Sequence, residues 1–215
     1  MLSDPAGNRR RIAYCSSGQE TFGWDWKPGD YYAWPHPPLA TLAEFQRYNL
    51  AIEALVDVYS AFHFARHQPK TFNSPFWRAF RLLLESIGHN APTDILWTNL
   101  FRCDLDGSVI NGSTPEELRE ILSFQRGLLT SEVRVLKPTA VLFFTGPDYD
   151  VALRDEFADV TTEPVMGRAE REFARLRHPQ LPGVAVRTYH PAYLMRTGRW
   201  AWLDDISHLV MEQMS

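Results

Sequence analysis

The sequence predicts an α/β protein in which helices cover both faces of a mostly parallel sheet, a three-layer α/β/α arrangement. Short apolar segments typical of buried strands alternate along the chain with longer segments of helical periodicity. Residues 140–144 are the clearest strand, a fully apolar run that ends at Thr145-Gly146. Several predicted strands end in loops with unusual polar or aromatic residues, and ligands of such folds bind at the carboxyl ends of the strands.

The elements follow from local signals along the chain. Strands are expected over residues 11–16, 95–101, 140–144, 173–177 and 184–189, and helices over residues 41–66, 75–87, 114–136, 148–157 and 200–214. Gly88 is placed to end the second helix. Thr114-Pro115-Glu116-Glu117 supplies a capping residue, a proline at the first helical position and acids at the positive end of the helix dipole.

Length and composition indicate one globular domain over residues 1–215, with an insertion at about 22–70. Apolar residues make up 45% and charged residues 22% of the chain, which is ordinary for a globular enzyme. No segment resembles a membrane helix or a secretory signal, so the sequence predicts a cytoplasmic protein without membrane contact. The net charge of −4 weakens a nucleic-acid interpretation but leaves room for positive charge on one face.

The cysteines and histidines argue against a metal site. Cys15 and Cys103 are too few for an iron–sulfur cluster or a disulfide framework, and both are interpreted as packing residues. His63 and His67 have a spacing that can hold zinc, but no cysteine or acidic partner follows close by. The sequence therefore predicts no metal and no cofactor.

Polar residues directly follow the first predicted strand. Gly18 allows close backbone approach to a ligand, and Gln19, Glu20 and Thr21 offer amide, carboxylate and hydroxyl groups. Read alone, the segment is equally a solvated polar turn.

Two further segments could bind a nucleobase. Asn99, near the end of the 95–101 strand, carries an amide whose donor and acceptor match a pyrimidine edge; alternatively it forms an Asx turn. Phe76 and Trp77 begin a helix, and either ring could stack on a flipped base or pack in the core.

The segment after the last predicted strand combines a histidine with apolar residues and an arginine. His190 could stabilise negative charge on a departing base. We expect Pro191 to Arg196 to form an exposed loop in which Tyr193 and Leu194 contact DNA and Arg196 binds phosphate. The alternative is a His-Pro turn whose apolar residues pack inward.

Together these segments resemble the uracil-DNA glycosylase superfamily. Gly18-Gln19-Glu20 is similar to its Gly-Gln-Asp water-activating motif, with Glu in place of Asp, and Phe76-Trp77 is similar to the Phe-Trp of its mismatch-specific branch. Residues 98–103, 114–117 and 136–138 resemble the Thr-Asn, Pro-Glu-Glu and Leu-Lys-Pro landmarks of the bacterial branches. His190-Pro191 matches the pair that opens the family's DNA-penetrating loop.

The resemblance spans roughly residues 14–196 and implies a central four-stranded sheet and a DNA glycosylase that acts as a monomer without metal or cluster. Glu20 and His190 are then catalytic. Gly18, Gln19, Thr21, Phe76 and Asn99 bind the flipped base, and Pro191, Tyr193, Leu194 and Arg196 contact DNA. Ala192 stands where the family usually has serine, which puts one phosphate contact in doubt.

Uracil is only one candidate base. The insertion at about 22–70, rich in aromatic residues, adjoins the expected pocket and could admit a hydroxymethylated or glucosylated cytosine of phage DNA. A non-catalytic binder of damaged or modified bases, and a small-nucleotide hydrolase, are the remaining alternatives. The sequence argues against the hydrolase, because Gly18 stands alone and does not form a glycine-rich loop that could cradle phosphates.

Overall fold

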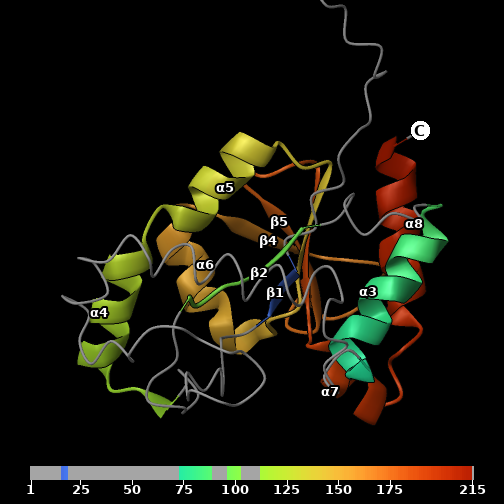
Figure 1. Ribbon diagram of the computed structural model, residues 1–215, viewed down its shortest axis with the longest axis horizontal. Coiled ribbons are helices and arrows are strands. Elements are labelled where there is room, and N and C mark those ends of the chain that lie inside the picture. The colour runs from blue at the N-terminus through green and yellow to red at the C-terminus, as the bar shows by residue number, and fades with distance from the viewer. Residues whose placement is uncertain (1–15, 19–72, 89–95, 103–111, 215) are drawn as a thin grey trace, which may run out of the picture.

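A computed structural model of the protein describes residues 16–18, 73–88, 96–102 and 112–214 (Figure 1). The elements, in chain order, are β1 (Ser16–Gly18), α3 (Pro75–Ser86), β2 (Trp97–Asn99), α4 (Pro115–Gln125), α5 (Leu128–Leu136), β3 (Ala140–Phe143), the 3₁₀ helix η4 (Pro147–Tyr149), α6 (Asp150–Glu156), β4 (Thr161–Pro164), β5 (Phe173–Arg177), β6 (Val184–Thr188), α7 (Pro191–Arg196) and α8 (Trp202–Met214). The predicted helix at 41–66 and the insertion at about 22–70 lie outside these ranges, as do Cys15, Cys103, His63 and His67.

Four strands form one sheet in the order β3-β6-β5-β4. β3 and β6 run parallel, with Ala140 opposite Val184, whereas β6–β5 and β5–β4 are antiparallel. The prediction of a mostly parallel sheet is therefore wrong for this sheet, although its four strands match the expected number. The short turn over residues 178–183 explains the difference, because a parallel connection needs a crossover of a dozen or more residues.

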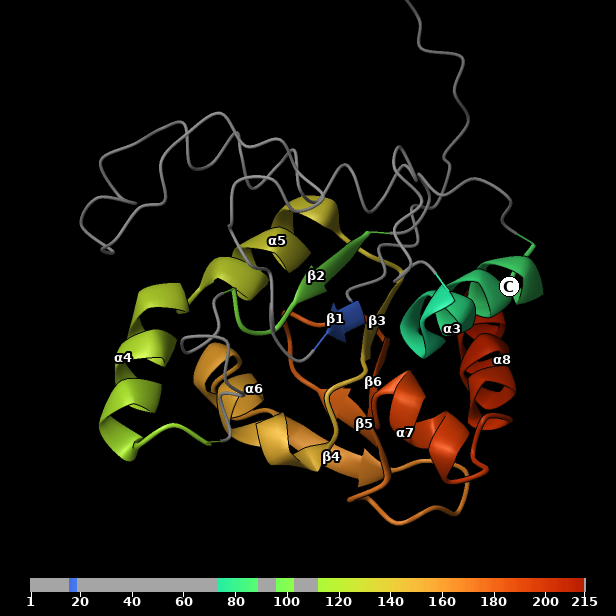
Figure 2. The same cartoon turned by 60° about the horizontal axis from the view of Figure 1, so that its bottom comes forward.

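A second, two-stranded sheet is fully parallel. β1 pairs with β2, and Gly18 lies opposite Asn99. β1 also lies close to β3, so that β1 is found between β2 and β3 (Figure 2). Ser17 and Gly18, which were expected to form a turn after the first predicted strand, therefore belong to a strand, and residues 11–15 of that prediction lie outside the described residues.

Side chains of β3 alternate between two hydrophobic cores. Ala140, Leu142 and Phe144 belong to one core, and Val141 and Phe143 belong to the other. The first core draws its helical residues from α3, α7 and α8, and the second draws them from α4, α5 and α6. The helices therefore lie in two groups, one on each face of the sheet (Figure 1). The prediction of a mixed α/β protein is confirmed.

The predicted helix at 114–136 is two helices. Its start is confirmed, because the Thr114 hydroxyl accepts from Glu117 N–H at 3.3 Å and the Glu117 carboxylate accepts from Thr114 N–H at 2.8 Å. The chain breaks at Gly127, which has a φ of 82°. Glu156 then accepts hydrogen bonds from the N–H groups of Gly127 and Thr130, at 2.8 and 2.6 Å, and so caps the second helix. A partner this distant in sequence leaves no local signal.

Several other elements agree closely with the prediction. α3 begins at Pro75 and gives way to Gly88, which has a φ of 74°. β5 spans the predicted residues 173–177, whereas β4 was not predicted because its exposed residues carry no apolar alternation. Among the described helices, none combines the length and the apolar character needed to span a membrane.

A buried arginine ties β6 to two neighbouring segments. The Arg187 side chain is 2% exposed, and its Nε atom lies 3.1 Å from Asp150 Oδ1 at the start of α6. Its Nη atoms donate to the carbonyl oxygens of Glu170 and Arg171, at 3.0 and 2.7 Å. Burial raises the pKa of Asp150, and the nearby Arg187 opposes that shift. The pair anchors the strand that leads directly to His190.

Candidate functional site

Phe76 and His190 have nearly parallel rings at the point where α3, β2 and the end of β6 converge. Their ring centroids are 6.0 Å apart and their planes are inclined by only 13°. Trp97 of β2 approaches Phe76 edge-on, with centroids 6.2 Å apart. Residues from three separate segments of the sequence therefore form one aromatic cluster.

The two aromatic residues at the start of α3 have different positions. Trp77 is buried and packs against Phe80 and Trp97, with centroids 5.3 and 5.2 Å apart. Phe76 is half-buried and faces His190. The helix is held at this end by Ser74, whose hydroxyl accepts from Trp77 N–H at 3.5 Å. Of the two rings, Phe76 is therefore the one available to a ligand.

His190 is held in one orientation by the start of α7. Its Nδ1 atom accepts a hydrogen bond from Ala192 N–H at 3.2 Å. Burial lowers the pKa of His190 from 6.5 to about 4, so the ring is neutral at pH 7. Because Nδ1 is an acceptor, the neutral ring carries its proton on Nε2. His190 thus offers one uncharged N–H donor.

Asn99 is buried, with 4% of its surface exposed, at the last position of β2. Its backbone pairs with Gly18, the last residue of β1. Gly18 and Asn99, both predicted to bind the base, are therefore neighbours. Gln19, Glu20 and Thr21 continue the chain from Gly18 but lie outside the described residues.

The ends of β3 and β6 are joined by a close contact that the sequence analysis did not predict. Gly146 donates its N–H to Thr188 O at 2.9 Å and has a φ of 73°. A Cβ atom at Gly146 would lie 3.3 Å from Cδ1 of Tyr189, whose ring in turn packs on Tyr193 with centroids 4.4 Å apart. Glycine directly after an apolar strand was the available signal for this approach. The contact fixes the backbone directly before His190.

The expectation of an exposed loop after His190-Pro191 is wrong. Residues 191–196 form α7, and Leu194 is fully buried against residues of α3 and α8. Pro191 is buried at the first position of the helix. The side chains predicted to contact DNA therefore lie on two sides of α7. Pro191 and Leu194 are buried and hold α7 to the core. Tyr193 is half-buried and Arg196 is exposed. Leu194 does not present a wedge in this arrangement.

Arg196 is exposed, as a role in binding phosphate requires. Its Cζ atom lies 5.4 Å from the centroid of the Tyr193 ring, a cation–π contact on the outer side of α7. Two participants that the sequence analysis did not assign to the site are Trp97 and Arg78. Trp97 flanks Phe76, and Arg78 lies one residue beyond the Phe76-Trp77 pair.

No family model, curated protein or solved structure matches the chain. Within the described ranges, no group of three or more His, Cys, Asp or Glu side chains is arranged to hold a metal ion. The function of the site therefore has to be argued from its geometry and from the sequence.

Proposed function

We propose that the protein is a DNA glycosylase with the three-layer fold of the uracil-DNA glycosylase superfamily, and that it hydrolyses the N-glycosidic bond of a flipped-out base. The observation that carries the proposal is the near-parallel packing of Phe76 and His190. Phe76 also contacts Trp97 of β2, the strand that ends at the buried Asn99. An aromatic face, a neutral N–H donor and an amide are the three groups that recognition and release of a nucleobase require.

Phe76 and Asn99 bind the extruded base. Stacking of a base on an aromatic ring is worth about 1–3 kcal/mol, which offsets much of the cost of unstacking it from the duplex. Asn99 is buried at the end of β2, and its amide would pair with the edge of the base. A buried amide that hydrogen-bonds one base discriminates strongly against others, because a mismatched edge leaves it unsatisfied.

His190 stabilises the leaving base. As the C1′–N bond breaks, its electron pair moves onto the base and negative charge develops on a carbonyl oxygen of the base. The Nε2–H of a neutral imidazole donates a hydrogen bond to that oxygen. The Nδ1 contact to Ala192 keeps the proton on Nε2 throughout the pH range above about 4.

Glu20 completes the reaction by analogy with the superfamily motif that Gly18-Gln19-Glu20 resembles. Its carboxylate orients a water molecule and offsets the positive charge that develops on the sugar. The water oxygen bonds to C1′ as the base departs. One water proton stays on the new hydroxyl and the other neutralises the base anion, so that the products are an abasic site and a free base. The pairing of Gly18 with Asn99 supports a position for this motif beside the base-binding residues.

The experiment is a direct assay of base release. The protein is incubated with matched duplexes that contain uracil, hydroxymethylcytosine, glucosylated hydroxymethylcytosine or only ordinary bases, and abasic sites are counted by alkaline cleavage. Release of one of the three modified bases, abolished in Glu20→Gln and strongly reduced in His190→Gln, supports the proposal. Release of uracil alone selects the repair substrate, and release of a modified cytosine selects the larger pocket.

Failure on every substrate would contradict catalysis. If the protein nevertheless binds a modified duplex more tightly than the ordinary one, and Glu20→Gln binds equally well, a non-catalytic base binder is the correct interpretation. If the protein instead hydrolyses free nucleotides, the small-nucleotide hydrolase replaces both.

A further inference from the structure

Four arginines near the junction of α7 and α8 lie over aromatic rings. Measured from Cζ to the ring centroid, the pairs are Arg78 on Trp200 at 5.7 Å, Arg196 on Tyr193 at 5.4 Å, Arg168 on Trp202 at 4.7 Å and Arg199 on Trp202 at 5.4 Å. A guanidinium placed over a ring is attracted by the ring face and loses freedom before any ligand arrives.

Carboxylates divide these four arginines into two kinds. Arg168 pairs with Asp205, and Arg199 pairs with Glu172 at 3.2 Å. For Arg78 and Arg196, by contrast, the described ranges contain no carboxylate partner, and both side chains are exposed. Both positive charges therefore lie over rings without a carboxylate partner in the described ranges.

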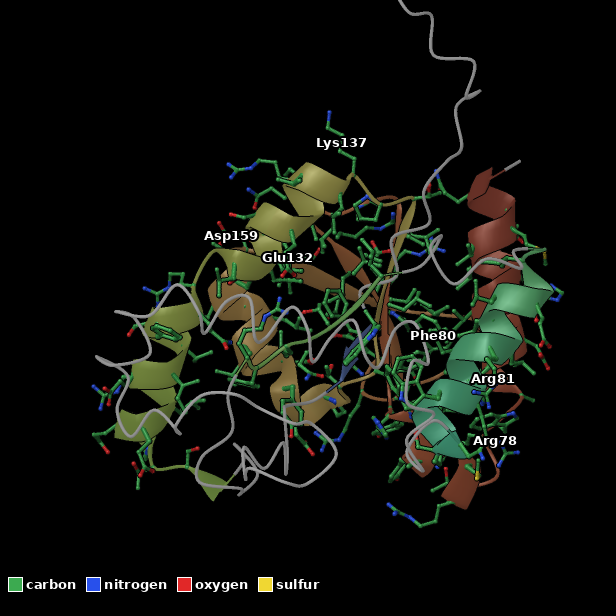
Figure 3. The ribbon with its side chains drawn as sticks, viewed as in Figure 1. Arg78, Phe80, Arg81, Glu132, Lys137 and Asp159 are labelled. Carbon is green, nitrogen blue, oxygen red and sulfur yellow. The ribbon has the colours of Figure 1, made fainter. Side chains whose placement is uncertain are left out.

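Both arginines lie on the helices at whose starts Phe76 and His190 stand. Arg78 follows Phe76 in the first turns of α3, and Arg196 ends the helix that His190 caps. Nη1 of Arg78 lies 4.0 Å from Sδ of Met195, the residue before Arg196. Arg78 lies at the end of α3 that packs beside α7 (Figure 3).

We propose that Arg78 and Arg196 form one phosphate-binding site, here called the arginine pair, which holds the DNA backbone beside the extruded nucleotide. The inference rests on the proposed function and adds Arg78 to the residues that bind DNA. A guanidinium that uses its face for a ring keeps its N–H edge free for phosphate oxygens. The net charge of −4 makes such a local site necessary, because the molecule as a whole repels a polyanion.

The test is the salt dependence of binding to an undamaged duplex, measured by fluorescence anisotropy. It compares the parent with Arg78→Gln, Arg196→Gln, the double variant and Arg134→Gln. Arg134 is the matched control, because it is an exposed arginine on α5, in the helix group on the opposite face of the sheet. Each lost phosphate contact lowers the slope of log K against log salt by about 0.9. We expect that loss for Arg78→Gln and Arg196→Gln, twice that loss for the double variant, and the parental slope for Arg134→Gln.

The variant Arg78→Lys tests whether the planar edge of the guanidinium contributes to binding in addition to its charge. It keeps the charge but loses the planar edge, so we expect the parental slope with weaker binding. Urea unfolding of every variant checks that the fold is retained. Slopes for Arg78→Gln and Arg196→Gln equal to that of Arg134→Gln would overturn the arginine pair.

The binding experiment and the base-release assay test the two proposals independently. If bases are released but the slopes do not change, the arginine pair is wrong and the glycosylase stands. If the slopes fall but no base is released, the arginine pair stands and the catalytic proposal fails. A parent protein that binds no duplex at low salt overturns both.

Discussion

The ring of Phe76 lies nearly parallel to the ring of His190, 6.0 Å away between centroids, although the two residues are far apart in the sequence. One ring can stack on a base, and the other can donate a hydrogen bond to it. Their common orientation lets one planar ligand meet both residues.

Replacement of Phe76 should separate base recognition from stability. Phe76→Leu keeps apolar volume but removes the stacking face, so we expect kcat/KM for base release to fall by about 5- to 150-fold, the equivalent of 1–3 kcal/mol. Phe157→Leu is the control, because Phe157 is a buried phenylalanine of the other hydrophobic core. It should lower the unfolding free energy and leave base release nearly unchanged. Equal losses of activity in both variants would show that Phe76 has only a packing role.

His190 should make stability depend on pH. The unfolded chain protonates this ring near pH 6.5, whereas the folded protein does so only near pH 4. The folded state therefore has its full stability above pH 6.5 and loses stability as the pH falls toward 4. Between about pH 7.5 and about pH 5, we expect the free energy of unfolding to fall by about 1–2 kcal/mol more in the parent than in His190→Gln.

Urea unfolding at the two pH values measures this difference, and an NMR titration of the His190 ring measures its pKa directly. Because the donor on Nε2 is present on both sides of neutrality, His190 should not limit base release between pH 6 and pH 8. A ring that titrates near its ordinary 6.5 would contradict the assignment of a buried neutral donor.

Gly146 should be intolerant of a side chain for two separable reasons. Alanine there meets both a positive φ and Cδ1 of Tyr189 at 3.3 Å. Gly127→Ala meets only the positive φ, since no atom lies within 4 Å of its added Cβ. The strain alone costs about 1–2 kcal/mol. We expect Gly146→Ala to be the more destabilised of the two variants in urea. It should also lose base release, because Tyr189 directly precedes His190. Equal stability of the two variants would show that Tyr189 moves aside freely.

The Arg187–Asp150 pair should show the energetics of a buried ion pair. Removing one partner leaves a buried charge, so we expect Asp150→Leu and Arg187→Leu each to cost about 3–5 kcal/mol. The double variant should cost less than the sum, because neither charge is then left alone. A double-mutant cycle from urea unfolding measures the coupling. Additive losses would show that the two side chains do not support each other.

The sequence was most informative where the physical cause is local. The capping box at Thr114, the proline start of α3 and the apolar run of β3 depend on residues a few positions apart, and all three were predicted correctly. The sequence was least informative where a distant partner intervenes. The break at Gly127 is stabilised by Glu156, and the antiparallel direction of β5 depends on which strand it pairs with.

The candidate site divides in the same way. Residue types and their order along the chain were sufficient to select Phe76, Asn99 and His190, because an aromatic ring, an amide and an imidazole at strand or helix ends are features of the sequence itself. Only the tertiary structure brought Phe76 against His190, buried Leu194 instead of exposing it, and left Arg78 and Arg196 without carboxylates in the described ranges. Burial and contact between distant segments depend on how the elements pack, and packing is a property of the whole fold rather than of any short segment.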